Sequence, residues 1–179
     1  MLNSVDLNKL KKISDILLNK IKIDKQIFVA GNGGSAAIAN HFLCDFNKGI
    51  KISSKGRLKP KIISLSSSAE IITAISNDID FKDIFKYQFE NYFQKNDVLV
   101  AFSCSGKSKN ITSLLNFCLK KNIQVIYITG FSNKLINNKN VTQLNLNCKN
   151  YGITEDIFSS LMHIISQYIR LYYKQNEIL

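Results

Sequence analysis

Two histidines and their acidic neighbours are the residues of this sequence best suited to proton transfer or metal binding. His41 and Asp45 are four positions apart in a predicted helix, so both side chains project from one helical face. His163 lies in a second predicted helix, with Glu155 and Asp156 near the start of that helix. Imidazole and carboxylate groups gathered in this way can share a divalent ion or relay a proton. A lone histidine on a helix is more often structural, so the interpretation requires both histidines to reach one site.

Two polar segments that follow apolar runs offer places for a phosphate group. One spans 31–35 and the other spans 103–110, where Ser103, Ser105 and Ser108 supply three hydroxyls close to Lys107. Free N–H groups at the start of a helix and serine hydroxyls both suit a phosphate, although such segments also serve simply as caps and turns. Neither segment is a nucleotide fingerprint, since Ala36 stands where GxGxxG has its third glycine. We therefore expect no nucleotide cofactor.

The elements that must position these residues alternate between strands and helices. Short apolar runs predict five strands, at 26–31, 61–66, 97–103, 123–129 and 141–147. Helical spacing predicts helices at about 5–21, 35–46, 83–93, after 110, and at about 154–174. Alternation of this kind is typical of an α/β protein with a parallel sheet covered on both faces, whose ligands bind beyond the carboxyl ends of the strands. A single domain over 1–179, with its α/β core at about 26–148, is the simplest organisation.

Composition argues against several other classes of protein. The net charge of +11 comes from lysines spread along the chain, and only Arg57 and Arg170 are arginines, so nucleic-acid binding ranks last among the alternatives. No apolar run approaches the roughly 20 residues of a membrane span, and the first residues lack the features of a secretory signal. We therefore expect a cytoplasmic protein without a membrane partner. Four cysteines without a CxxC pair indicate reduced thiols.

Three motifs together give the sequence a specific resemblance. Gly31-Asn-Gly-Gly-Ser-Ala-Ala37 followed by His41, Ser76-Asn-Asp78, and Ser103-Cys-Ser-Gly-Lys-Ser-Lys-Asn110 resemble, in order and spacing, the phosphoheptose isomerase branch of the SIS (sugar isomerase) family. The similarity runs from about residue 5 to residue 175. It implies a flavodoxin-like αβα sandwich with a central five-stranded parallel sheet, and a homotetramer whose active sites are built from neighbouring subunits.

The same resemblance implies an activity. Such isomerases interconvert D-sedoheptulose 7-phosphate and D-glycero-D-manno-heptose 7-phosphate, which feeds activated heptose for lipopolysaccharide or capsule. Two alternatives stay open: a non-catalytic SIS protein of the type that binds a replication initiator, and an isomerase or sensor of another phosphorylated sugar.

The resemblance also implies roles for individual residues. Asp45 and His163 are the expected acid–base pair, and one zinc ion is expected at each active site. The expected metal ligands are His41, Asp45, Glu155 and His163. The expected substrate-binding residues are Asn32, Gly33, Ser35, Asn77, Asp78, Ser103, Cys104, Ser105, Ser108 and Glu155. Glu155 and His163 are about 12 Å apart if both lie in one helix, so either Glu155 precedes that helix or the two reach one site from different subunits.

Several positions depart from the family pattern. Asp45 stands where a longer Glu is usual, Glu155 where Gln is common, and Cys104 where Thr is frequent. Gly49 replaces an arginine and Gly152 an aspartate that touch the substrate in some members. The charge lost at position 49 could be replaced by Lys48 or Lys51.

Overall fold

A five-stranded sheet in which every strand is parallel to its neighbours forms the centre of the protein. The computed structural model describes residues 5–131 and 134–175. The strands are β1 (Gln26–Ala30), β2 (Lys61–Ser64), β3 (Val98–Ser103), β4 (Gln124–Thr129) and β5 (Val141–Asn145). Their order, β2-β1-β3-β4-β5, is the flavodoxin-like order of doubly wound sheets. The predicted fold class is therefore confirmed.

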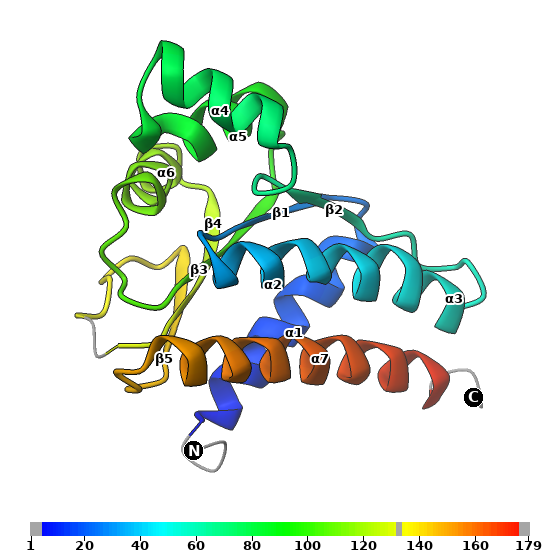
Figure 1. Ribbon diagram of the computed structural model, residues 1–179. Coiled ribbons are helices and arrows are strands. Elements are labelled where there is room, and N and C mark those ends of the chain that lie inside the picture. The colour runs from blue at the N-terminus through cyan, green and yellow to red at the C-terminus, as the bar shows by residue number, and fades with distance from the viewer. Residues whose placement is uncertain (1–4, 132–133, 176–179) are drawn as a thin grey trace.

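Helices cover both faces of this sheet. They are α1 (Leu7–Lys22), α2 (Gly34–Leu43), the π-helix η2 (Cys44–Ile50), α3 (Lys51–Ser53), α4 (Ala69–Asp78), the 3₁₀-helix η3 (Phe81–Asp83), α5 (Ile84–Tyr92), α6 (Lys109–Lys120) and α7 (Tyr151–Gln175). Figure 1 shows α4, α5 and α6 on one side of the sheet, with α1, α2 and α7 on the other. Among the described residues no helix is both long and apolar enough to cross a membrane.

Two apolar cores hold the layers together, one on each face of the sheet. Successive side chains of a strand point to opposite faces, so Val29, Val100 and Phe102 join the core under α1, α2 and α7. Phe28 and Leu99, one position away, join the core under α5 and α6. The strands are apolar on both faces because both faces are covered. This explains the continuous apolar runs in the sequence.

The two terminal helices agree with the sequence prediction except at their ends. Asp6 caps α1, and its side chain accepts a hydrogen bond from the Lys9 N–H at 3.0 Å. The last helix begins at Tyr151 rather than at residue 154, because the Asn150 side chain accepts from the Ile153 N–H at 3.0 Å and caps it. Glu155 therefore lies inside α7, not in a bend before it.

The predicted helix at 35–46 is longer in the structure and changes its winding. It starts at Gly34 as α2, widens to a π-helix from Cys44 to Ile50, and ends after α3 at Ser53. Such π-helical turns are rare in proteins, and those that do occur often lie at functional sites. Asp45 lies in this segment.

Candidate active site

The polar loops that follow β1 and β3 meet at the carboxyl edge of the sheet. The two strands are direct neighbours, with Ala30 opposite Ala101. Their loops are joined by a reciprocal pair of amides: Asn32 Nδ2 donates to Asn110 Oδ1 at 2.9 Å, and Asn110 Nδ2 donates to Asn32 Oδ1 at 2.8 Å. Asn110 is buried, and its Oδ1 also accepts from the Ile111 N–H. This pair fixes the first polar loop against the second.

The loop after β3 folds around its own hydroxyl groups. Ser103 Oγ accepts a hydrogen bond from the Gly106 N–H at 3.1 Å, and Ser105 Oγ accepts from the Lys107 N–H at 3.2 Å. Ser108 is the N-cap residue of α6, but its side chain makes no capping hydrogen bond. The Ser108 side chain therefore leaves the first N–H groups of α6, those of Lys109 and Asn110, uncapped, whereas the Ile111 N–H donates to Asn110 Oδ1.

A small cavity lies between these loops and the start of α7, and we call it the serine cavity. Its volume is about 130 Å³. Its walls are formed by Asn32, Ser35, Phe102, Ser103, Cys104, Ser105, Ser108, Tyr151 and Glu155. Ligand pockets usually measure about 300 Å³ or more, so the cavity of one chain has room for a phosphate group and a few further atoms. Seven of the predicted substrate-binding residues line it, and Gly33 is the N-cap residue of the adjoining helix α2.

Glu155 and Cys104 form the wall of the serine cavity nearest α2. Cys104 Sγ lies 3.7 Å from Glu155 Oε1 and 3.6 Å from Ser35 Oγ. Burial, together with the nearby Glu155 carboxylate, raises the pKa of the Cys104 thiol, so the thiol is neutral. The Glu155 carboxylate packs on Gly34, where a Cβ atom would lie 2.1 Å from Oε2. A carboxylate is favourable at this place because it is the positive end of α2.

A second polar group, which we call the histidine cluster, consists of His41, Asp45 and His163. The imidazole rings of the two histidines are edge to face, with centroids 5.2 Å apart. His163 Nδ1 lies 2.8 Å from Asp45 Oδ2, and His41 Nε2 lies 4.0 Å from Asp45 Oδ1. About half of each imidazole is exposed, whereas the Asp45 side chain is 19% exposed. The cluster is thus open to a ligand on its imidazole side.

Asp45 is held as a carboxylate by the groups around it. Its burial alone would raise the pKa, but hydrogen bonds from His163 and Ser166, and the charges of His163 and Arg170, outweigh that effect and lower the pKa of Asp45. Ser166 Oγ donates to Asp45 Oδ2 at 3.2 Å, and Arg170 Nη2 lies 3.7 Å from Oδ1. Ser166 and Arg170 were not predicted as site residues.

The histidine cluster has the donors of a zinc site. One ligand atom from each of His41, Asp45 and His163 can be chosen so that all three lie within 4.8 Å of one another. Two imidazoles and one carboxylate, with the remaining positions open, are a typical ligand set for catalytic zinc. The donor chemistry therefore fits a divalent ion. Among the described residues Glu155 does not join this group, and it lines the serine cavity instead.

The serine cavity and the histidine cluster occupy different places in one chain. None of the three cluster residues lines the cavity, and α7 carries Glu155 and His163 eight residues apart. Asn77 and Asp78 also lie outside the cavity: they are exposed at the end of α4, where Asn77 Nδ2 donates to Asp78 Oδ1 at 2.8 Å. A single chain thus assembles two parts of the predicted site without joining them.

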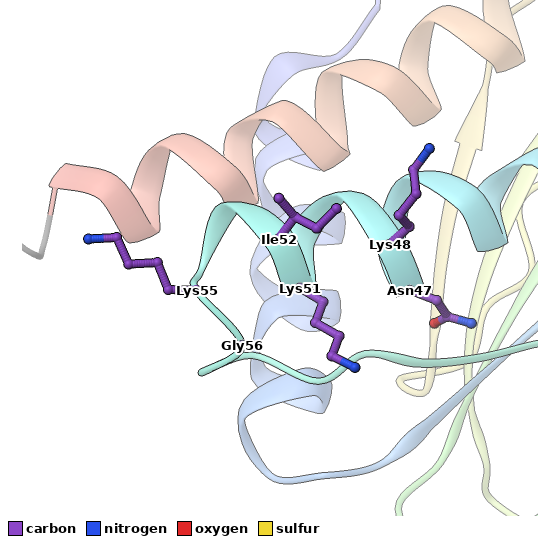
Figure 2. A pocket seen from close by; sticks show the side chains of 6 residues that line it. All are labelled: Asn47, Lys48, Lys51, Ile52, Lys55 and Gly56. Carbon is purple, nitrogen blue, oxygen red and sulfur yellow. The ribbon is translucent and has the colours of Figure 1, made fainter.

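The two lysines near Gly49, Lys48 and Lys51, do not line the serine cavity. An open cavity of about 600 Å³ is lined by Asn47, Lys48, Lys51, Ile52, Lys55 and Gly56. Figure 2 shows the side chains of Lys48, Lys51 and Lys55 pointing in different directions. The positive group that lies over Gly49 is Arg170, whose Nη2 would be 1.7 Å from a Cβ atom at that position.

Comparison with known proteins gives this arrangement a family. The SIS domain model matches residues 2–130, a range that includes the polar loop after β3. The chain therefore contains a SIS domain. A phosphoheptose isomerase of Geotalea uraniireducens is 31% identical over 157 residues, which cover 88% of this chain and 82% of that protein. One of Clostridium acetobutylicum is 34% identical over 128 residues, or 72% of this chain and 62% of that protein. The chain therefore belongs to the phosphoheptose isomerase family of SIS domain proteins, as the motifs predicted.

Solved structures agree in fold. The structure of a phosphoheptose isomerase from Francisella tularensis superposes with a TM-score of 0.85 at 22% identity, over 95% of this chain and 88% of that one.

Proposed function

We propose that this protein is an aldose–ketose isomerase that interconverts D-sedoheptulose 7-phosphate and D-glycero-D-manno-heptose 7-phosphate. Membership of the phosphoheptose isomerase family supports the reaction class. The observation that carries the proposal is the contact of 2.8 Å between His163 Nδ1 and Asp45 Oδ2 beside the His41 ring. A protein that only offered a binding platform would have no need of this half-exposed acid–base group. Its product would feed activated heptose for lipopolysaccharide or capsule.

We propose that the serine cavity holds the phosphate end of the sugar. Ser105 and Ser108 offer hydroxyls there, and the start of α6 offers the N–H groups of Lys109 and Asn110 and the positive end of the helix dipole. Asn32 and Ser35 extend the same wall from the first loop. Phosphate bound at this point would fix one end of the substrate, so that the carbon atoms that react are held at a set distance from it.

The histidine cluster would carry out the proton transfer. Aldose–ketose isomerisation moves a proton between C1 and C2 through an enediol, and it needs a base, an acid and a stabiliser for the developing oxyanion. Asp45 is ionised and can accept the carbon-bound proton and return it to the neighbouring carbon. His163, in contact with Asp45, can exchange a proton with the substrate oxygen. His41 lies beside both and completes the polar side of the site.

We propose zinc as the ion that the cluster binds, with His41, Asp45 and His163 as ligands in one chain. The ion, when bound, would polarise the substrate carbonyl. Glu155 could join the ligand set only from another subunit, because α7 separates it from His163.

We propose further that residues 1–179 form one SIS domain and that four chains assemble with sites between them. Apolar side chains on α7 support an interface: Ile153, Ile164 and Leu171 are 40%, 44% and 54% exposed. Intervals of 11 and 7 residues place them on one face of the helix. An exposed apolar stripe of this kind suits contact with another chain. Such contact could bring the serine cavity of one subunit to the histidine cluster of another.

The direct test is an NMR time course of the purified protein with sedoheptulose 7-phosphate, with and without added zinc. We expect heptose 7-phosphate to appear, and we expect His163→Ala to abolish turnover while circular dichroism and melting temperature stay close to wild type. Absence of turnover under both conditions would refute the isomerase proposal. Thermal shift with several sugar phosphates then separates the alternatives, because only a true ligand stabilises the protein by mass action. Stabilisation by a different sugar phosphate alone would favour another substrate or a sensor role.

A further inference from the structure

Arg170 reaches the histidine cluster through a notch in the helix that carries Asp45. The notch is Gly49, in the π-helical segment η2, and the guanidinium group occupies the space where a side chain at that position would stand. A Cβ atom on Gly49 would lie 1.7 Å from Arg170 Nη2 and 2.6 Å from Cζ. Any other residue at this position would therefore displace the guanidinium group.

Arg170 contacts both the backbone and the side chain of Asp45. Its Nη2 donates a hydrogen bond to the Asp45 backbone carbonyl at 3.0 Å, and the same nitrogen lies 3.7 Å from the carboxylate oxygen Oδ1. In a π-helix the carbonyl of Asp45 pairs with the N–H five residues on, and its second lone pair remains free to accept from Arg170. The opposite carboxylate oxygen, Oδ2, is the one in contact with His163 and Ser166.

Contact with water does not explain the position of the Arg170 guanidinium group. Its Nε is buried, and within 5–131 and 134–175 that atom has no hydrogen-bond partner. Burying a donor without a partner is unfavourable, so the contact made at the other end of the guanidinium group must offset the loss. That contact is with Asp45.

We propose that Arg170 is a positioning residue for Asp45 in the isomerisation proposed above, and that Gly49 is the notch which admits it. The bond to the backbone carbonyl fixes the Asp45 main chain within the π-helical segment. The positive charge beside Oδ1 holds the carboxylate in the orientation that presents Oδ2 to His163. Arg170 and Gly49 do not line the serine cavity, so neither needs to touch the phosphate end of the substrate.

Two substitutions on different helices test the proposal, because each removes the same contact. Arg170→Met keeps the length of the side chain but has no donor and no charge. Gly49→Ala keeps the arginine but fills the notch. Alanine also favours helix more than glycine does, so lost activity in Gly49→Ala cannot result from a weakened helix. Arg57→Met is the matched control, since Arg57 is exposed, donates to the Ser54 carbonyl at 3.3 Å, and belongs neither to the serine cavity nor to the histidine cluster.

We expect both variants to lower kcat about tenfold to a hundredfold, the usual effect of losing a partner that orients an active-site ligand, with KM within about twofold of wild type. Arg170→Lys should recover part of kcat, because it restores a positive donor. The double variant should be no slower than the slower single variant, because both act through one contact. Arg57→Met should behave as wild type. Unchanged kcat in either single variant, or losses that multiply in the double variant, would overturn the proposal.

A second readout does not depend on turnover. The chain has only two histidines, so ring ¹⁵N and ¹H signals of histidine-labelled protein at one fixed pH can be assigned with a His41→Gln variant. We expect Arg170→Met and Gly49→Ala to shift the His163 Nδ1 signal in the same direction, while Arg57→Met leaves it in place. If wild type has no isomerase activity but these shifts occur, the proposed function fails and the link between Arg170 and Asp45 stands. If the shifts are absent, the link itself is wrong.

Discussion

Replacing Gly34 with alanine isolates the contribution of Glu155 to the serine cavity. The new Cβ atom would lie 2.1 Å from Glu155 Oε2 and 2.3 Å from Cδ. Ordinary contact is at about 3.5 Å, so the carboxylate must retreat by more than about 1 Å. The end of a glutamate is flexible enough to move, so we expect the free energy of unfolding to change by less than about 1 kcal/mol. A misplacement of about 1 Å can cost on the order of a hundredfold in rate, or about 2.7 kcal/mol in the barrier.

The assay is kcat/KM for sedoheptulose 7-phosphate, measured beside urea unfolding of the same preparation. Gly34→Ala should lose about a hundredfold with unchanged stability, and Glu155→Ala should lose a similar amount. Glu90→Ala removes an exposed glutamate of α5 that does not line the serine cavity, and it should retain full activity. Full activity in Gly34→Ala would mean that the position of the Glu155 carboxylate does not matter to the reaction.

Three further predictions follow from single contacts. Ser166→Ala removes a hydrogen bond that lowers the pKa of Asp45, so the acidic limb of the pH–rate profile should move to higher pH, while unchanged profiles would contradict the assignment of Asp45 as base. Ser108→Ala should raise KM several-fold without lowering stability, because its hydroxyl caps no helix. Burial raises the pKa of Cys118 to about 12, so mass spectrometry should find iodoacetamide on the exposed Cys44 and none on Cys118 until the protein is unfolded.

Ser68 is the matched control for Ser108. It occupies the same N-cap position on α4, but its side chain does accept a hydrogen bond, from the Ile71 N–H. Ser68→Ala should therefore lower the free energy of unfolding by about 1 kcal/mol and leave KM unchanged. A rise of KM in both variants would show that the effect at Ser108 is not specific to the serine cavity.

The sheet was predictable because its signals are local in the sequence. Each strand is a short apolar run. The segments between these runs have apolar residues at helical spacing, which indicates that helices cover both faces of the sheet. The pairing of His41 with Asp45 is local as well, since four residues in a helix return a side chain to the same face. The apolar spacing places the start of α7 three residues late, because the helix begins at the Asn150 cap, ahead of its apolar pattern.

The rest of the site depends on contacts that no local pattern encodes. Asn32 and Asn110 are 78 positions apart, and their pairing follows from the adjacency of β1 and β3. Ser166 and Arg170 meet Asp45 only because α7 packs beside α2 and η2. The π-helical winding also had no predictable cause in the sequence. Gly49 gave one weak signal, a glycine inside a helix, which often has a packing reason.

The single unbroken helix α7 has a consequence for how the enzyme can be regulated. Glu155 and His163 are fixed about 12 Å apart by the rise of that helix, so no motion of a loop can carry one to the other within a subunit. In the assembly proposed above, a second copy would bring the phosphate end of the reaction to its proton-transfer end. If the protein is diluted below the dissociation constant of this proposed assembly, it should keep binding sugar phosphate and cease to isomerise it, so that the expression level would set the specific activity.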